Sequence, residues 1–240
     1  MSEMLETCAG VKIGGVNRLT TIDYPEHLAA VVFTQGCPWR CPYCHNWPLL
    51  DVNDEDAVKW SSVLDILRRR KDFLDGVVFS GGEPTLWPEL GCCLEEVVKM
   101  GFDVALHTNG AFPERLKNIL KKGLVNWVAM DIKAPFEEYQ DITGVPHSGE
   151  AARKSAGILL SSEVDVEFRT TVHPEMLSRK QVADIAETLY NLGAGKYVIQ
   201  KCRTEYCRVP FMRAVAPDFN SYLLSIRRDI KPFFPYLEIR

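Results

Sequence analysis

The sequence predicts an α/β fold in the form of a partial (βα)6 barrel. Six apolar runs of strand length recur along the 240 residues, and helix-like stretches lie between them. Strands that alternate with helices favour a parallel sheet with right-handed crossovers. No clear break separates these units, so we expect one domain over residues 1–240, with an open, doubly wound sheet as the alternative arrangement.

The expected strands are apolar runs, most of which end in polar, glycine or proline residues. They cover residues 29–34, 76–80, 103–107, 127–131, 164–172 and 196–200. The helices expected between them cover residues 61–74, 88–100, 113–122, 150–161 and 178–192. Gly101, Gly123 and Gly193 follow three of these helices, as C-cap glycines do. Ser178 with Gln181 resembles a capping box at the start of the last one.

Both ends of the chain lie outside this alternation. Residues 1–28 are expected to form an N-terminal arm or hairpin, and residues 209–240 a C-terminal extension. In that extension we expect a last helix over 217–230, followed by a segment that adds an edge strand or covers the end of the sheet. Neither end carries the composition shift that would mark a second domain.

The composition excludes several classes of protein. With 46% hydrophobic residues, 25% charged residues and a net charge of -4, the chain offers no basic surface for nucleic acid. No apolar stretch approaches the roughly 20 residues of a membrane span, and the N-terminus lacks a signal-peptide pattern. We therefore expect a cytoplasmic protein without a membrane partner, in which eight cysteines favour metal or redox chemistry over a disulfide framework.

Polar clusters follow the expected strands at their carboxyl ends. In chain order they read QGCPWRC, SGGEP, HTNG, DIK, RTTVHP and QKC. In parallel α/β folds the carboxyl ends of the strands share one face, where active sites are built. Segments far apart in the sequence are therefore expected to meet in a single pocket.

Three cysteines in and just after the first of these clusters predict a metal centre. Cys37, Cys41 and Cys44 lie within eight residues of one another. A structural zinc usually takes four protein ligands, and a [4Fe-4S] cube normally takes four cysteines. If the centre is a cube, three cysteines leave one iron open to a small molecule, and an open iron suits a catalyst better than an electron carrier.

The other cysteines leave alternatives open. A zinc knuckle of three cysteines and one histidine would use His45, or would borrow Cys202 or Cys207 as its fourth ligand. Cys202 and Cys207 are also candidates for an auxiliary cluster, although two cysteines do not complete one. The adjacent pair Cys92 and Cys93 falls within an expected helix and is expected to pack as small apolar side chains, while Cys8 stands alone.

One known family carries this cysteine spacing. The segment CPWRCPYC resembles the CxxxCxΦC signature of the radical S-adenosylmethionine (SAM) enzymes, with Tyr43 as the aromatic residue. The HN that follows is similar to the glycyl-radical-enzyme activating branch, and residues 20–46 most resemble activating proteins of anaerobic ribonucleoside-triphosphate reductase. The resemblance covers residues 12 to about 200. The DYPE segment departs from the glycine-bearing form common among these activases.

The resemblance implies a fold, an activity and two cofactors. It implies a partial barrel of the radical SAM type, in which Cys37, Cys41 and Cys44 hold a [4Fe-4S] cluster and SAM completes the coordination of the open iron. Flavodoxin or ferredoxin would supply an electron, and reductive cleavage of SAM would yield a radical that abstracts hydrogen from a glycine. That glycine would belong to a partner glycyl radical enzyme, expected to be anaerobic ribonucleotide reductase.

The resemblance also implies a set of SAM-binding residues on the same face. They are Tyr43, His45, Gly81, Gly82, Glu83, Thr108, Asn109, Asp131, Lys133 and Arg169. Glycines permit close backbone approach to a ligand, and the Arg169 guanidinium can bind a carboxylate through two hydrogen bonds. Asp131 and Lys133 can equally form an ion pair that holds their loop. His107 stands where many activases have an acidic residue.

Two other functions remain as alternatives at this stage. The first is a radical SAM enzyme that acts on a small molecule or another modification target. The second, from a different class, is a zinc-stabilised binding or adaptor protein. The two classes differ in the metal that the cysteine cluster would hold.

Overall fold

The structure, a computed structural model, describes residues 8, 10–53, 55–209, 218–235 and 237–240. Its strands form one eight-stranded sheet whose spatial order follows the chain from β1 to β8. The strands are β1 (Ile13–Thr20), β2 (Ala29–Thr34), β3 (Gly76–Gly81), β4 (Asp103–Thr108), β5 (Trp127–Asp131), β6 (Asp165–Val172), β7 (Tyr197–Lys201) and β8 (Glu238–Ile239). Strands β2 to β7 are parallel to one another.

The sheet confirms the partial barrel. Its order never reverses, so it lacks the switch point of a doubly wound sheet, and that alternative is wrong. β1 pairs antiparallel with β2 and forms one edge, while β8 pairs parallel with β7 and forms the other. Each of the six expected strands lies within one residue of its observed bounds, because buried parallel strands read as continuous apolar runs.

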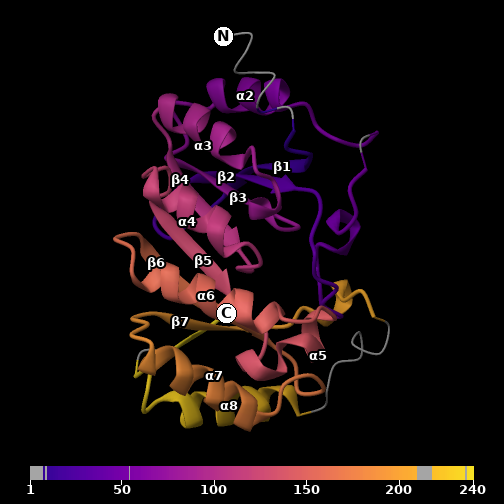
Figure 1. The fold of residues 1–240 in the computed structure, drawn as a ribbon, viewed down its shortest axis with the longest axis vertical. Helices are drawn as coiled ribbons and strands as arrows, with labels where there is room; N and C mark the ends of the chain where they lie inside the picture. The colour runs from indigo at the N-terminus through magenta and orange to yellow at the C-terminus, as the bar shows by residue number, and fades with distance from the viewer. Residues whose placement is uncertain (1–7, 9, 54, 210–217, 236) are drawn as a thin grey trace.

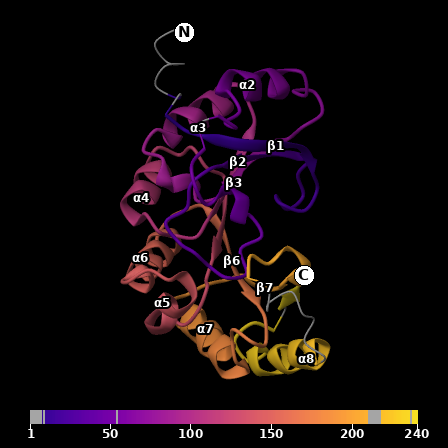
Figure 2. The same cartoon turned by 90° about the vertical axis from the view of Figure 1, so that its right-hand side faces the viewer.

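Helices cover one side of this sheet (Figures 1 and 2). In chain order the described helices are α2 (Trp60–Arg68), α3 (Leu90–Lys99), α4 (Pro113–Lys121), α5 (Tyr139–Thr143), α6 (Ser148–Leu160), α7 (Arg179–Asn191) and α8 (Phe219–Ile230). In α3 the buried residues Leu90, Cys93, Leu94 and Val97 recur at helical spacing and form the stripe that packs on the sheet.

The predicted helix signals are present, with one boundary misplaced. Gly101, Gly123 and Gly193 all adopt positive φ after their helices, and Ser178 and Gln181 form the capping box. α2 ends at Arg68, six residues before its expected end, at the first of four consecutive basic residues, which repel one another along a helix. α5 was not expected from the sequence. Residue 217, the expected start of the last helix, lies outside the described residues.

One cysteine expectation is wrong. Cys92 does not pack as a free apolar side chain but forms a disulfide with Cys8, across 84 residues of sequence. The chain brings the two Cα atoms to 5.5 Å, within the range that a disulfide spans. Its neighbour Cys93 is fully buried in the core, as expected. Because the side chains of adjacent helix positions point in different directions, only one of the two cysteines faces Cys8.

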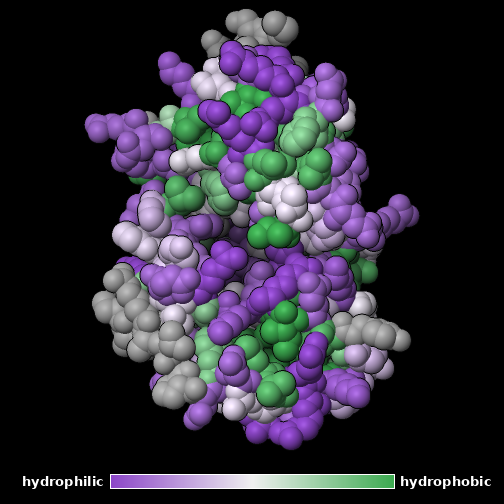
Figure 3. Space-filling view, turned by 180° about the vertical axis from the view of Figure 1, so that it is seen from behind, coloured by the Kyte–Doolittle hydropathy of each residue, from purple (hydrophilic) through white to green (hydrophobic). Residues whose placement is uncertain are grey.

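The far side of the molecule carries a hollow. Figure 3, seen from behind the view of Figure 1, shows a depression at mid-height with hydrophilic residues along much of its rim. Among the described residues, no helix combines the length and apolar character needed to cross a membrane.

Candidate active site

A cavity of about 1150 Å³ lies at the carboxyl ends of the parallel strands. Its walls come from the loop after β2, from the ends of β3 to β7 and from the turn between β1 and β2. All of the site residues predicted from the sequence line it: Cys37, Cys41, Tyr43, Cys44, His45, Gly81, Gly82, Glu83, Thr108, Asn109, Asp131, Lys133 and Arg169. The geometry of parallel strands therefore assembles one site from segments up to 132 residues apart, from Cys37 to Arg169.

The cysteines lie on the cluster loop, residues 37–46. Backbone hydrogen bonds hold this loop, with Cys37 N donating to Leu50 O at 3.0 Å and Cys44 N donating to Cys41 O at 3.2 Å. None of the three cysteines is in a disulfide. Burial raises the pKa of the Cys37 thiol to about 12 and that of the Cys41 thiol to about 11. The thiols therefore become ligands only where a cation compensates the loss of their protons.

Gly81 and Gly82 are required by the protein's own backbone. At Gly81, where φ is +119°, an added Cβ would lie 2.3 Å from the backbone of Thr34. At Gly82 it would lie 2.2 Å from Gly36 O, at the start of the cluster loop. The sequence suggested that these glycines make room for a ligand. The structure adds a more immediate reason, because β3 and the cluster loop approach too closely for any side chain.

Glu83 joins two strand ends. Its carboxylate is fully buried and accepts hydrogen bonds from Thr85 N at 3.0 Å, Thr108 Oγ1 at 2.7 Å and Asn109 N at 2.7 Å. Burial raises the pKa of Glu83, and these hydrogen bonds oppose the rise. The geometry makes Glu83 a positioning residue for the segment after β4. Its expected role as a countercharge to SAM stays a prediction.

Asn109 connects the segment after β4 to the cysteines. Its Nδ2 lies 3.5 Å from Cys37 Sγ, and its Oδ1 accepts a hydrogen bond from Ala111 N at 2.9 Å. On the other side of the cluster loop, Asn46 Nδ2 donates to Gly81 O at 2.9 Å. The two amides tie the cluster loop to β3 and to the end of β4. Contacts of Thr108 and Asn109 with SAM stay predictions.

Asp131 and Lys133 form the ion pair that the sequence left open. Lys133 Nζ lies 2.7 Å from Asp131 Oδ2 and 5.7 Å from the centre of the Tyr43 ring. Burial opposes the charge on Asp131, but Lys133 and Arg169 outweigh it and lower the Asp131 pKa. The charge of Lys133 also acts against the rise in the Cys41 pKa that burial causes. Lys133 thus places a positive charge beside the cluster loop.

Arg169 lines the cavity and carries a buried donor that is not used within the described residues. Its Nε donates to Glu167 Oε1 at 2.6 Å, and its guanidinium lies 5.1 Å from the centre of the Trp127 ring. Arg169 is only 5% exposed, and its Nη2 has no hydrogen-bond partner within the described part of the chain. A buried guanidinium with a free donor is suited to an anionic ligand such as a carboxylate.

Glu167 was missed in the sequence. Its fully buried carboxylate binds Arg169, Lys196 at 2.7 Å and Arg240 at 3.0 Å. Burial opposes its charge, but the Arg169, Lys196 and Arg240 cations lower the Glu167 pKa. A signal was available, since Glu167 and Arg169 stand two residues apart on one strand and therefore share a face. Arg240, 71 residues further along, offered none.

His107 is not a ligand to a cation in this arrangement. Its Nε2 lies 2.7 Å from Asp23 O, which joins β4 to the turn between β1 and β2. Burial, reinforced by the charge of Arg169, lowers the pKa of His107 to about 4. The imidazole is therefore neutral at physiological pH and donates this hydrogen bond.

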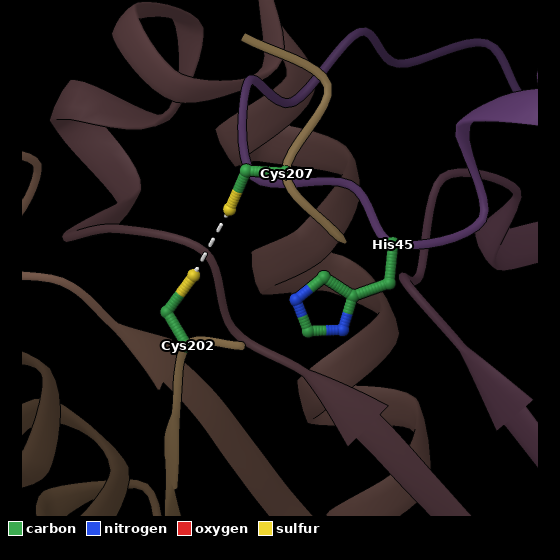
Figure 4. A group of neighbouring side chains, drawn as sticks. All are labelled: His45, Cys202 and Cys207. Carbon is green, nitrogen blue, oxygen red and sulfur yellow. Dashed lines mark hydrogen bonds between the residues drawn. The ribbon is translucent and has the colours of Figure 1, made fainter. Parts of the chain in front are cut away.

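His45 also lies beside a second group of possible ligands. Its ring is near Cys202 and Cys207 on the loop after β7, and the ligand atoms of the three residues lie within 4.8 Å of one another (Figure 4). The zinc alternative paired His45 with the three cysteines of the cluster loop. The structure instead groups His45 with the two distant cysteines.

The whole core of the fold matches one known family. A model of the radical SAM superfamily matches residues 31–198, which run from β2 to β7 and include the cluster loop. The chain belongs to the radical SAM superfamily. Enzymes of this superfamily use a [4Fe-4S] cluster and SAM, so this radical SAM protein is an oxidoreductase and not a zinc adaptor.

Two relatives of known sequence are similar to this radical SAM protein. A protein of Methanocaldococcus jannaschii, provisionally named a glycyl-radical enzyme activating enzyme, is 34% identical over 196 residues, covering 79% of each chain. The pyruvate formate-lyase-activating enzyme of Clostridium pasteurianum is 33% identical over 143 residues, covering 55% of this chain and 57% of its own.

Solved structures share the fold at low sequence identity. SuiB of Streptococcus suis, in a crystal structure with S-adenosylmethionine, gives a TM-score of 0.64 at 16% identity, over 85% of this chain and 47% of SuiB. This radical SAM protein therefore spans about half the length of SuiB. QueE of Escherichia coli gives a TM-score of 0.57 at 15% identity, over 99% of this chain and 98% of QueE.

The side chains at the cavity fit the two cofactors of the superfamily. Three thiols outside any disulfide lie on one loop of the cavity and would supply three ligands for a [4Fe-4S] cluster, one fewer than a cube normally takes. SAM carries a carboxylate and an amino group, and Arg169, which lines the same cavity, has a buried Nη2 without a partner in the described part of the chain. Tyr43 is buried beside the cysteines, and its hydroxyl has no partner among the described residues. Unused polar atoms in a buried wall are what a polar ligand would satisfy.

Proposed function

We propose that this radical SAM protein activates a glycyl radical enzyme. The observation that carries the proposal is its similarity to the Methanocaldococcus jannaschii protein over 79% of both chains. The similarity extends over far more of the chain than the cysteine motif alone. The partial match to a pyruvate formate-lyase-activating enzyme supports the same class of activity.

In this proposal each segment of the cavity has a task. Cys37, Cys41 and Cys44 hold the cluster, and Arg169 pairs with the carboxylate of SAM. When bound, the reduced cluster supplies the electron that cleaves SAM to methionine and a 5'-deoxyadenosyl radical, which takes a hydrogen atom from glycine. The protein fixes the reacting groups and excludes water from them. Lys133, with its charge beside the cluster loop, favours the anionic state of the ligating thiolates.

The size and rim of the cavity support a macromolecular substrate. A volume of about 1150 Å³ exceeds the roughly 300–1,000 Å³ of ordinary small-ligand pockets. Leu19, near the end of β1, and Ile22, in the turn between β1 and β2, line the cavity and are 41% and 68% exposed. We propose that a glycine-bearing loop of the partner enters past this turn. The resemblance of residues 20–46 supports anaerobic ribonucleotide reductase as the partner. We propose flavodoxin or ferredoxin as the electron donor.

An electron paramagnetic resonance experiment tests the activity. The anaerobically reconstituted protein is mixed with SAM, a reductant and anaerobic ribonucleotide reductase, and a glycyl doublet is expected to develop on the reductase. Cys41→Ala is the matched control, since it removes one cluster ligand and should abolish both SAM cleavage and the doublet. SAM cleavage that needs a small molecule and no protein partner would contradict the proposal and support the small-molecule alternative.

A further inference from the structure

Three metal-ligating side chains meet beside the cluster loop without belonging to its cysteine motif. Cys202 and Cys207 flank the short helix η4 (Thr204–Tyr206) after β7, and His45 follows the third cysteine of the cluster loop. Figure 4 shows the two sulfurs and the imidazole facing a common space between the two loops. The Sγ atoms of Cys202 and Cys207 are 3.4 Å apart, and all three ligand atoms lie within 4.8 Å of one another.

The two cysteines are held rigidly by the fold. Cys202 is 2% exposed and Cys207 is fully buried, and both are thiols outside any disulfide. Cys202 N donates to Val172 O at 3.1 Å, which fixes it to the end of β6, and Cys207 N donates to Thr204 O at 3.2 Å. His45 is exposed, so its ring has room to move toward the sulfurs. Such a pair of fixed thiols with one adjustable imidazole can close around an ion.

The distances suit a single tetrahedral ion. Zinc binds thiolate sulfur at about 2.3 Å and imidazole nitrogen at about 2.0–2.1 Å, so two sulfur ligands of a tetrahedral site lie roughly 3.8 Å apart. The observed 3.4 Å is close to that separation and well beyond the roughly 2.05 Å of a disulfide. Nitrogen and sulfur together are the ligands that zinc prefers in proteins.

We propose that His45, Cys202 and Cys207 form a second metal site, which binds one zinc ion and is separate from the site of the [4Fe-4S] cluster. Water is one candidate for the fourth ligand, and Glu205, on η4 between the two cysteines but outside the group of atoms within 4.8 Å, is the other if its side chain rotates. The ion would join the cluster loop to the loop after β7. These loops already touch, since Val209 N donates to Pro42 O at 3.3 Å, and Cys202, Arg203, Thr204 and Glu205 line the cavity.

The site gives His45 a role other than the contact with SAM that the resemblance implies. An imidazole that ligates zinc is turned toward the loop after β7 and is not available to stack on SAM. The zinc would then stiffen one wall of the cavity mouth. This proposal does not depend on the activity proposed above, because it concerns metal binding alone.

Elemental analysis of the anaerobically reconstituted holoenzyme, purified with zinc in the medium, tests the site. We expect about four iron atoms and about one zinc atom per chain. The double variant C202S/C207S should lose the zinc and keep the iron and the visible absorption of the cluster. The reciprocal variant C37A/C41A/C44A should lose the iron and keep the zinc. Glu205→Gln distinguishes the two candidates for the fourth ligand. Zinc binding should weaken in this variant if Glu205 is the ligand and should stay unchanged if water is.

X-ray absorption at the zinc edge gives a second measurement on the unmodified protein, in case a variant fails to fold. Two sulfur scatterers at about 2.3 Å and a nitrogen scatterer at about 2.0–2.1 Å are expected. In the His45→Gln variant, competition with a chelator should show zinc binding weakened by more than about 10-fold. The proposal is overturned if the holoenzyme contains no zinc, if C202S/C207S retains it, or if mass spectrometry of the anaerobic protein finds Cys202 disulfide-bonded to Cys207.

Discussion

The Nδ2 atom of Asn109 lies 3.5 Å from the Sγ atom of Cys37, so the end of the third parallel strand touches the first cysteine of the cluster loop. Asn109 is itself held by Glu83, whose carboxylate accepts a hydrogen bond from its backbone N–H. A donor placed in this way lies in the immediate surroundings of the cluster. Hydrogen bonds to ligating sulfur are among the factors that set the reduction potential of an iron–sulfur cluster.

Asn109→Ala is expected to make the cluster harder to reduce. Loss of a donor to thiolate sulfur destabilises the more negative, reduced state. A hydrogen bond contributes about 0.5–1.5 kcal/mol, which corresponds to roughly 20–65 mV for one electron. The reduction potential of the cluster should fall by that amount. A redox titration followed by electron paramagnetic resonance measures the shift. Asn53→Ala is the control on the exposed surface, and an equal shift in both variants would contradict a specific contact with Cys37.

Arg169→Ala is expected to weaken SAM binding while leaving the iron content of the protein unchanged. Hydrogen bonds to a charged group contribute about 1.5–3 kcal/mol, so loss of the guanidinium predicts an affinity lower by roughly 10- to 150-fold. Anaerobic calorimetry with SAM measures this change. Lys196→Ala is the matched control, because Lys196 also binds Glu167 at 2.7 Å but does not line the cavity. A control that loses as much affinity would show that the Glu167 network, and not contact with SAM, is responsible.

Gly82→Ala is expected to displace the cluster loop from β3. The new Cβ would lie 2.2 Å from Gly36 O, and relief of such a contact typically costs about 1–3 kcal/mol. The free energy of unfolding, measured by chemical denaturation, should fall. The iron content after reconstitution should fall as well. Gly91→Ala, in α3, is the control, since its nearest contact is 3.8 Å and the substitution there should be neutral or stabilising. Equal stability of the two variants would contradict the close approach.

His107 is expected to make stability depend on pH. Its pKa falls from 6.5 in the unfolded chain to about 4 in the folded chain, first through burial and then through Arg169. The unfolded chain then binds the proton more readily, so the free energy of unfolding should be constant above pH 6.5 and fall as the pH drops toward 4. A shift of this size corresponds to about 3 kcal/mol.

Denaturation of wild type and His107→Gln between these pH values tests the dependence. The glutamine amide can still donate to Asp23 O, while it removes the titrating group. The loss of unfolding free energy at low pH should therefore be smaller in His107→Gln than in the wild type, by about 3 kcal/mol. His147→Gln, at an exposed position, is the control and should behave as the wild type. An unchanged pH profile in His107→Gln would show that His107 is not the group responsible.

The sequence by itself determined the strands and the location of the site. The runs at 29–34 and 127–131 match β2 and β5 in full, because a strand buried on both faces is apolar along most of its length. Cys37 and Arg169 could be assigned to one cavity from the sequence, because parallel strands bring their carboxyl ends to one face whatever the loops between them do. Local composition and one topological rule were sufficient for both.

Only the tertiary structure decided which side chains contact one another across that face. The Cys8 to Cys92 disulfide, the contact of Arg240 with Glu167 and the grouping of His45 with Cys202 and Cys207 all join positions far apart in the chain. No local spacing encodes such contacts, since they depend on how loops and helices settle on the completed sheet. The close approach at Gly82 has the same origin, because the atom that forbids a side chain belongs to another strand end.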